Sequence, residues 1–227
     1  MPIKSYVLRG GRMSAAQQKA YAELAPLFCV PFSPMPLDFA AIFGNKNPVI
    51  VEIGFGMGSV TAALAGSHPE LNYLGIEVFK AGIGKLLWEI DKRSLRNVRI
   101  IEHDAVECAE KMLPDSGISG FHIFFPDPWH KKRHHKRRLV QRPFIDLLAA
   151  KLAPGAYFYF VSDCKDYAES ALAGLNAAPL LTNTCNGFAP PQSWRPKTKF
   201  EEKAAAAGRE IRELYFVKQP AYKTAGC

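Results

Sequence analysis

The sequence predicts an α/β fold built on a mostly parallel, doubly wound sheet. From residue 48 onward, short apolar runs alternate with stretches of helical length, and a turn with three glycines at 54–58 follows the first run. Carboxylates also follow the ends of successive runs. Strands and helices alternating at this spacing are typical of parallel sheets with right-handed crossovers, which bind ligands at the C-terminal ends of their strands.

The first 47 residues are expected to form an N-terminal arm and a helix, ahead of a single domain over 48–227. Ser14 can cap a helix at 15–24. Four prolines between residues 26 and 36 argue against a long regular element beyond it. We therefore expect one folded domain with an N-terminal extension.

The remaining elements follow from the alternation of apolar runs. Strands are expected at 49–53, 72–78, 98–103, 121–125 and 156–161, and a late antiparallel strand at 210–218. Helices are expected at 59–65, 80–92, 105–113 and 143–152.

Composition excludes several classes of protein. Of the 227 residues, 48% are hydrophobic and 22% charged, which is ordinary for a globular domain. No apolar run approaches the ~20 residues of a membrane-spanning helix, and the N-terminus lacks the apolar region of a secretory signal. The five cysteines form no Cys-x-x-Cys pair, which argues against a disulfide framework and against a zinc site. We expect a cytoplasmic protein without a metal and without a membrane partner.

The glycine turn and the carboxylate before it favour a cationic ligand. Gly54 and Gly56 let the backbone approach a ligand closely, but Ser59 stands where a dinucleotide-binding turn has its third glycine. Glu52 would face a pyrophosphate unfavourably. It suits S-adenosylmethionine, which carries an ammonium and a sulfonium group, so this donor is favoured over NAD.

Two further carboxylates extend this site along the sheet. Glu77 closes the second strand, where an acidic side chain can bind both ribose hydroxyls. Asp104 ends the third strand, within reach of an adenine amino group, although a helix cap explains Asp104 equally well. Three carboxylates at three successive strand ends together favour a binding site for S-adenosylmethionine over one for NAD.

A rigid carboxylate and a dense basic run follow the fourth strand. Asp127 lies between Pro126 and Pro128, which restrict its backbone, and we expect it beside the sulfonium. Trp129 is expected to cover a planar ligand or to pack in the core. Much of the net charge of +8 is concentrated at 131–142, with a second basic group at Lys4, Arg9 and Arg12. The basic run favours contact with a nucleic acid; a solvated helix face is the simpler alternative.

A polar loop near the C-terminus offers a second candidate contact. Asp163 ends the fifth strand, and a proline-punctuated segment follows at 195–201. Thr198 and Glu201 can hydrogen-bond a base edge, or they can form a capping box at a helix start. The spacing fits both interpretations.

The chain closely resembles the tRNA (guanine-N7)-methyltransferases of the TrmB type. The matching segments are 52–58, 75–78, 103–105, 125–131 and 195–201, and the run Pro-Asp-Pro-Trp-His-Lys is the most specific of them. The region 5–12 is similar to the basic N-terminal arm of the family. The resemblance implies a Rossmann-like class I methyltransferase that transfers a methyl group from S-adenosylmethionine to N7 of a guanosine in the tRNA variable loop (position 46 of the tRNA), giving N7-methylguanosine.

The resemblance also implies a role for individual residues. The donor site would comprise Glu52, Gly54, Gly56, Glu77, Asp104 and Asp127, and Asp127 would also be the catalytic carboxylate. Contacts with the substrate would come from Lys131, Asp163, Thr198, Lys199, Phe200 and Glu201. The RNA would be held by Arg133, His134, His135, Lys136, Arg137 and Arg138. The expected partner is tRNA, and the expected state is a monomer or a homodimer.

Two departures from the family pattern and three rival functions stand beside this interpretation. The family has an arginine and a glycine where this chain has Lys203 and Ala204, so the bidentate fork of arginine is lost there. An amino-methyltransferase acting on adenine or cytosine would usually show Asn/Asp-Pro-Pro-Tyr/Phe in place of Asp127-Pro128-Trp129. A non-catalytic RNA-binding protein of the same fold is disfavoured by the intact donor-site carboxylates, and an NAD-dependent oxidoreductase by Glu52 and the missing third glycine.

Overall fold

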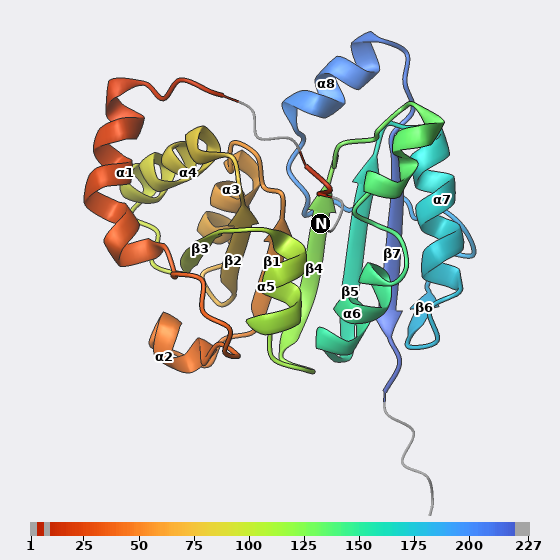
Figure 1. The fold of residues 1–227 in the computed structure, drawn as a ribbon, viewed down its shortest axis with the longest axis horizontal. Helices are drawn as coiled ribbons and strands as arrows, with labels where there is room; N and C mark the ends of the chain where they lie inside the picture. Colours follow the sequence, from red (N-terminus) through yellow and green to blue (C-terminus); the bar gives the residue numbers. More distant parts are fainter. Residues whose placement is uncertain (1–3, 7–9, 221–227) are drawn as a thin grey trace, which may run out of the picture.

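The computed structural model describes residues 4–6 and 10–220, so the predictions that concern Arg9 and Cys227 lie outside the described residues. A sheet of seven strands runs through the domain in the order β3-β2-β1-β4-β5-β7-β6 (Figure 1). Its strands are β1 (Val49–Ile53), β2 (Asn72–Glu77), β3 (Val98–Glu102), β4 (Ile118–Phe124), β5 (Leu152–Ser162), β6 (Leu181–Asn183) and β7 (Arg212–Lys218).

The sheet has the predicted mixture of directions. Strands β1 to β5 pair in parallel, whereas β7 is antiparallel to β5 and β6 is antiparallel to β7. The chain enters at β1, moves outward to β3 and returns to β4 on the other side of β1. This reversal makes the C-terminal ends of β1 and β4 the switch point where such folds bind ligands.

Helices cover both faces of the sheet. Residues of α1, α3 and α4 pack with Ile50 and Ile100 on one face, and residues of α5, α6 and α7 pack with Val51 and Phe158 on the other. Because Ile50 and Val51 face opposite sides, both of which are covered by helices, β1 is buried along its whole length. The helices are α1 (Ala15–Phe28), α2 (Phe39–Phe43), α3 (Ser59–Ser67), α4 (Lys80–Arg93), α5 (Ala105–Lys111), α6 (Phe144–Lys151), α7 (Lys165–Asn176) and α8 (Lys199–Ala206), with a 3₁₀ helix η1 (Lys132–Arg137).

The predicted end of the first helix was wrong. Ser14 caps α1 through a capping box with Gln17, as its sequence suggested, but the helix continues past Pro26 to Phe28. Pro26 lies in the last turn, where its missing N–H removes one backbone hydrogen bond from a helix that is about to end. Phe28 packs against the core beside α4, and this burial offsets the loss.

The chain that follows α1 protects the outer edge of the sheet. Cys29 forms a parallel bridge with Ile100 of β3, and the Val30 amide donates to the Ile100 carbonyl over 2.8 Å. This short contact covers part of an edge strand that would otherwise expose unpaired backbone groups. Across the described part of the chain, every helix is too short or too polar to cross a bilayer.

Candidate active site

The glycine turn after β1 is packed on one side and open on the other. Gly54, Gly56 and Gly58 adopt φ values of 74°, 58° and 69°, which strongly favour glycine. A Cβ on Gly58 would lie 2.6 Å from Cβ of Leu86 in α4, whereas a Cβ on Gly54 or Gly56 would meet nothing within 4 Å. The backbone of the first two glycines is therefore accessible to a ligand.

Glu52 is a buried carboxyl beneath this turn. Its side chain, in a residue only 3% exposed, accepts a hydrogen bond of 2.7 Å from the Thr61 hydroxyl of α3. Burial raises the pKa of Glu52 to about 7; the Thr61 hydrogen bond opposes this shift, and the negative charge of Glu77 adds to it. A buried acid of this kind gains from a cationic partner, because the partner stabilises the ionised form.

The pKa of Glu52 predicts how stability depends on pH. In the unfolded chain Glu52 ionises near its ordinary value of 4.5, but in the folded protein it keeps its proton up to about 7. Glu52 therefore makes its full contribution to the free energy of unfolding below pH 4.5. This contribution, at most about 3 kcal/mol, is lost as the pH rises toward 7. Urea unfolding of the protein and of Glu52→Gln, each at about pH 5 and about pH 8, isolates this contribution. Equal pH dependence of the two proteins would contradict the raised pKa.

Glu77 holds the glycine turn against the end of β2. One carboxylate oxygen accepts from the Gly56 amide over 2.9 Å, and the other accepts from the amides of Val78 and Phe79 over 2.7 and 3.0 Å. These bonds fix the orientation of the carboxylate at the mouth of the turn. Glu77 thus connects two of the segments that we predicted to form one site.

Asp104 has the capping role that its sequence position allowed. Its Oδ1 accepts from the amides of Val106 and Glu107 at the start of α5, over 2.9 and 3.3 Å. Its Oδ2 lies 3.3 Å from the ammonium of Lys4, which also lies 3.6 Å from a carboxylate oxygen of Glu107. No local sequence pattern predicts this ion pair between Lys4 and the end of the third strand.

Asp127 lies in a turn held in an unusual backbone conformation. Phe125 and Trp129, on either side of the Pro-Asp-Pro sequence, have φ values of 50° and 49°. Bulky side chains seldom adopt this left-handed region, and such strain tends to occur at functional sites. The Phe125 amide donates to the Val161 carbonyl of β5 over 2.8 Å, so the turn is anchored to the sheet. The carboxylate is therefore presented from a constrained backbone.

Residues 4–6, which we call the arm segment, lie beside the C-terminal end of β4 (Figure 1). The indole of Trp129 donates to the Ser5 carbonyl over 3.1 Å. Arg137 donates to the carbonyls of Lys4 and Tyr6 over 3.1 and 3.3 Å, and its guanidinium lies 4.0 Å above the Trp129 ring. Trp129 thus contacts the arm segment.

The basic run is uniform in sequence but divided in the structure. Arg138 is 4% exposed, and it donates to the Pro128 carbonyl over 3.0 Å and to the Asp166 carboxylate over 2.5 Å. Its guanidinium also lies over the Tyr167 ring. His134, His135 and Arg137 are partly buried. The side chains open to solvent are Lys131, Lys132, Arg133 and Lys136.

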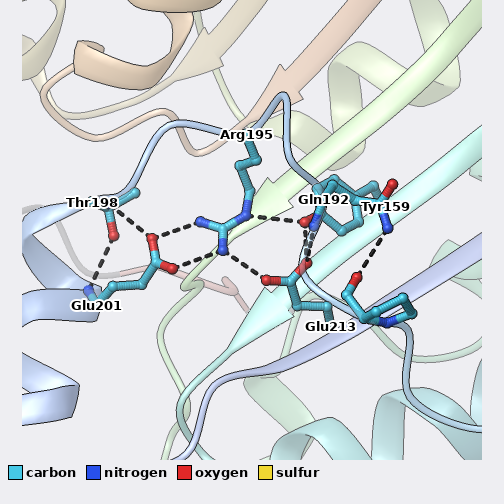
Figure 2. A network of polar contacts seen from close by, with 7 residues as sticks. Tyr159, Gln192, Arg195, Thr198, Glu201 and Glu213 are labelled. Carbon is cyan, nitrogen blue, oxygen red and sulfur yellow. Dashed lines mark hydrogen bonds and ion pairs between the residues drawn. The ribbon is translucent and has the colours of Figure 1, made fainter.

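The polar loop after β6 contains a buried ion network (Figure 2). Thr198 and Glu201 form the capping box of α8, with bonds of 3.1 Å and 2.8 Å between each side chain and the backbone of the other. The Glu201 carboxylate also pairs with Arg195, and Arg195 pairs with Glu213 of β7. The capping alternative is therefore present, and sequence reasoning missed Arg195 and Glu213. The one available signal was the charge of Glu213 directly before the apolar run 214–217 of β7.

The remaining predicted substrate residues lie on both sides of this network. Asp163, just after β5, pairs with Arg209 over 2.8 Å. Phe200 is 60% exposed and its ring stacks on Phe125, with centroids 5.8 Å apart. Among residues 4–6 and 10–220, no three His, Cys, Asp or Glu side chains are grouped as metal ligands.

Known proteins resemble this chain over most of its length. A family model described as a putative methyltransferase matches residues 46–214. A tRNA (guanine-N(7)-)-methyltransferase of Thiobacillus denitrificans is 49% identical over 94% of each chain. One from Dechloromonas aromatica is 48% identical over 96% of this chain and 88% of its own.

Solved structures resemble the fold at much lower identity. A 16S rRNA methyltransferase, KamB, superposes with a TM-score of 0.58 at 16% identity, over 93% of this chain and 97% of its own. A 16S rRNA (adenine(1408)-N(1))-methyltransferase variant from Catenulisporales acidiphilia, solved with its cosubstrate SAM, gives 0.53 at 15% identity, over 83% and 95%. These likenesses concern the fold and confirm the predicted Rossmann-like class.

Proposed function

The chain belongs to the family of tRNA (guanine-N(7)-)-methyltransferases, and from this premise we propose that it methylates N7 of a guanosine in the tRNA variable loop, giving N7-methylguanosine. The observation that carries the proposal is the set of carboxylates at or near the C-terminal ends of four neighbouring strands. Glu52, Glu77 and Asp104 belong to or follow β1, β2 and β3, and Asp127 follows β4. Because the substrate is tRNA, the proposal includes activity in the cytoplasm.

The residues present fit S-adenosylmethionine. The open backbone at Gly54 and Gly56 admits a ligand, and the buried Glu52 carboxyl gains from a cation. Glu77 would face the ribose and Asp104 the adenine. When bound, S-adenosylmethionine would supply an electrophilic methyl group: the N7 lone pair forms the N–CH3 bond, and sulfur keeps the electron pair of the broken S–CH3 bond.

Asp127 has an electrostatic role in this proposal. Guanine N7 carries a lone pair and no proton, so the reaction needs no general base. The purine becomes cationic on methylation, and a rigid carboxylate stabilises the charge that develops in the transition state. Asp127 can also accept hydrogen bonds from guanine N1–H and the exocyclic amino group, which would orient N7 toward the methyl group.

The position of N7 sets a requirement for the RNA. N7 lies on the major-groove edge, which is deep and narrow in A-form RNA, so the guanosine must leave the stack or lie in an irregular loop. The exposed side chains of the basic run, Lys131, Lys132, Arg133 and Lys136, suit phosphate contacts that fix register without reading sequence.

The direct test is methylation of unmodified tRNA transcripts with methyl-labelled S-adenosylmethionine, followed by mapping of the labelled nucleoside. We expect N7-methylguanosine at one variable-loop position. Label on an adenine or cytosine would favour the amino-methyltransferase alternative. Donor binding by calorimetry without any transfer to RNA would favour a non-catalytic RNA-binding protein.

The basic run should also determine how binding depends on salt. The logarithm of the binding constant falls with the logarithm of the salt concentration, and each phosphate contact steepens this slope by about 1. The double variant Arg133→Gln/Lys136→Gln is therefore expected to reduce the slope by about 2. Filter binding over a salt series measures the change. Lys46→Gln, an exposed lysine just before β1 at the opposite edge of the sheet, is the control. An unchanged slope in the double variant would remove these side chains from the RNA contact.

A further inference from the structure

Helix α8 projects from the C-terminal edge of the sheet with little packing of its own (Figure 1). Its one buried residue is Ala204. Its first turn carries Lys199 and Phe200, both exposed, and the Phe200 ring stacks on Phe125 two residues before Asp127. The position of α8 therefore sets where these two side chains stand relative to the catalytic carboxylate.

Arg195 connects α8 to the sheet. Its side chain is 3% exposed, and its two terminal nitrogens donate to the two carboxylate oxygens of Glu201 over 2.6 and 2.8 Å. The same guanidinium donates to Glu213 of β7 over 2.7 Å and to the Tyr159 hydroxyl of β5 over 3.0 Å. Figure 2 shows Arg195 between the helix start on one side and the two strands on the other.

Arg195 and Glu201 stay charged in this network although both are largely buried. Burial opposes the charge of Arg195, but Glu201 and Glu213 outweigh it and raise the pKa of the guanidinium. Burial alone would raise the pKa of Glu201, but the donors from Arg195 and Thr198 hold it below its ordinary value. Both oxygens of Glu201 are thus used by Arg195, and one also accepts from the Thr198 amide.

A buried ion network of this kind contributes orientation more than stability. Apolar residues of similar volume often stabilise a fold as well as a buried pair does, whereas a planar fork fixes the angle between its partners. Lysine keeps the charge but cannot make the two parallel bonds to Glu201.

We propose that Arg195 is a positioning residue that holds α8, and through it Lys199 and Phe200, in place for the tRNA substrate, with Glu201 as the link. This inference rests on the proposed function. Arg195 acts on a surface that meets the RNA, so its loss should weaken tRNA binding in the ground state and the transition state alike. Such a loss raises KM for tRNA and leaves kcat nearly unchanged.

The test uses Arg195→Lys, Glu201→Gln and the double variant. Glutamine serves as well as glutamate at the third position of a capping box, so Glu201→Gln removes the ion pair and keeps the helix start. Each single variant is expected to raise KM for tRNA about ten-fold, with kcat within about three-fold and donor Kd within about two-fold of the wild type. Because the two residues act in series, the double variant should be no worse than the more severe single variant.

Lys151→Met is the control, since it removes the mostly buried lysine of an ion pair of 2.7 Å with the exposed Asp115 at the opposite edge of the sheet. It is expected to lower the melting temperature without moving KM. An unchanged KM in Glu201→Gln, or effects of the two variants that multiply, would overturn the proposal. So would a fall in donor affinity that tracks the melting temperature. If Arg195→Lys fails to fold, Glu201→Gln alone decides the outcome. N7-methylation by the wild type in the same assay shows that the proposed function holds, so a failure of the Arg195 proposal can be told apart from a failure of the proposed function.

Discussion

Replacing Asp127 with alanine is expected to slow methyl transfer by about 10²–10³-fold while changing tRNA affinity by less than about three-fold. The carboxylate lies between two prolines in a turn flanked by Phe125 and Trp129 in the left-handed region. A side chain presented from so constrained a backbone needs little rearrangement when charge develops on the purine. Single-turnover rates and filter-binding affinities measure the two quantities separately.

Two variants make this measurement specific. Asp127→Asn keeps the shape of the side chain and removes its charge, so an electrostatic role predicts a loss close to that of alanine. Asp91→Ala removes an exposed carboxylate near the end of α4 and is expected to leave the rate unchanged. Equal losses of rate and of tRNA affinity in Asp127→Ala would show that Asp127 only binds the substrate.

Replacing Gly82 with alanine is expected to disrupt the donor site and to destabilise the protein by several kcal/mol. A Cβ on this residue of α4 would lie 1.8 Å from the carbonyl oxygen of Gly56 and 2.9 Å from its carbon. Both atoms are backbone, so no flexible side chain can move aside, and the glycine turn itself must shift. Donor affinity by calorimetry and the midpoint of urea unfolding measure the two effects.

Gly66 provides a matched substitution in the neighbouring helix. It is exposed in α3, and a Cβ there would meet only Leu95, at an ordinary 3.8 Å. Gly66→Ala is expected to leave donor affinity unchanged and to stabilise the protein by up to about 1 kcal/mol, because alanine favours a helix more than glycine does. Wild-type donor affinity in Gly82→Ala would show that α4 does not fix the glycine turn.

The strands and helices around the switch point could be predicted because each has a local pattern. Strand β1 is apolar except for Glu52, glycines follow it directly, and Glu77 and Asp104 mark the ends of the next two strands. Between 164 and 206, helix α7, strand β6 and helix α8 were not predicted as elements. Only the capping box at Thr198 hinted at the last of these. Helix α7 buries Tyr167, Ala168, Ala171 and Leu175 at helical spacing, a pattern that the prediction did not use, whereas the three residues of β6 are too few to establish a period.

Interactions between distant segments account for what the sequence did not reveal at the site. Arg138 is one basic residue among many in sequence, yet Asp166 and Tyr167 bury it and leave its neighbours to the solvent. Arg195 and Glu213 are charged residues that become a buried pair only when the strands assemble. Local spacing cannot distinguish such partners, because the deciding group lies elsewhere in the chain.

The contacts of the arm segment have a consequence for the order in which the molecule is built. Lys4 bonds to Asp104, Ser5 to Trp129, and Lys4 to Arg137, across separations of 100, 124 and 133 residues. During synthesis the arm segment leaves the ribosome before these partners, which lie 100 or more residues further along the chain. Closing loops of this length has an entropic cost that a few hydrogen bonds at a surface repay only once β4 is in place. The arm segment therefore docks late, although it is made before the strands and turns that it contacts.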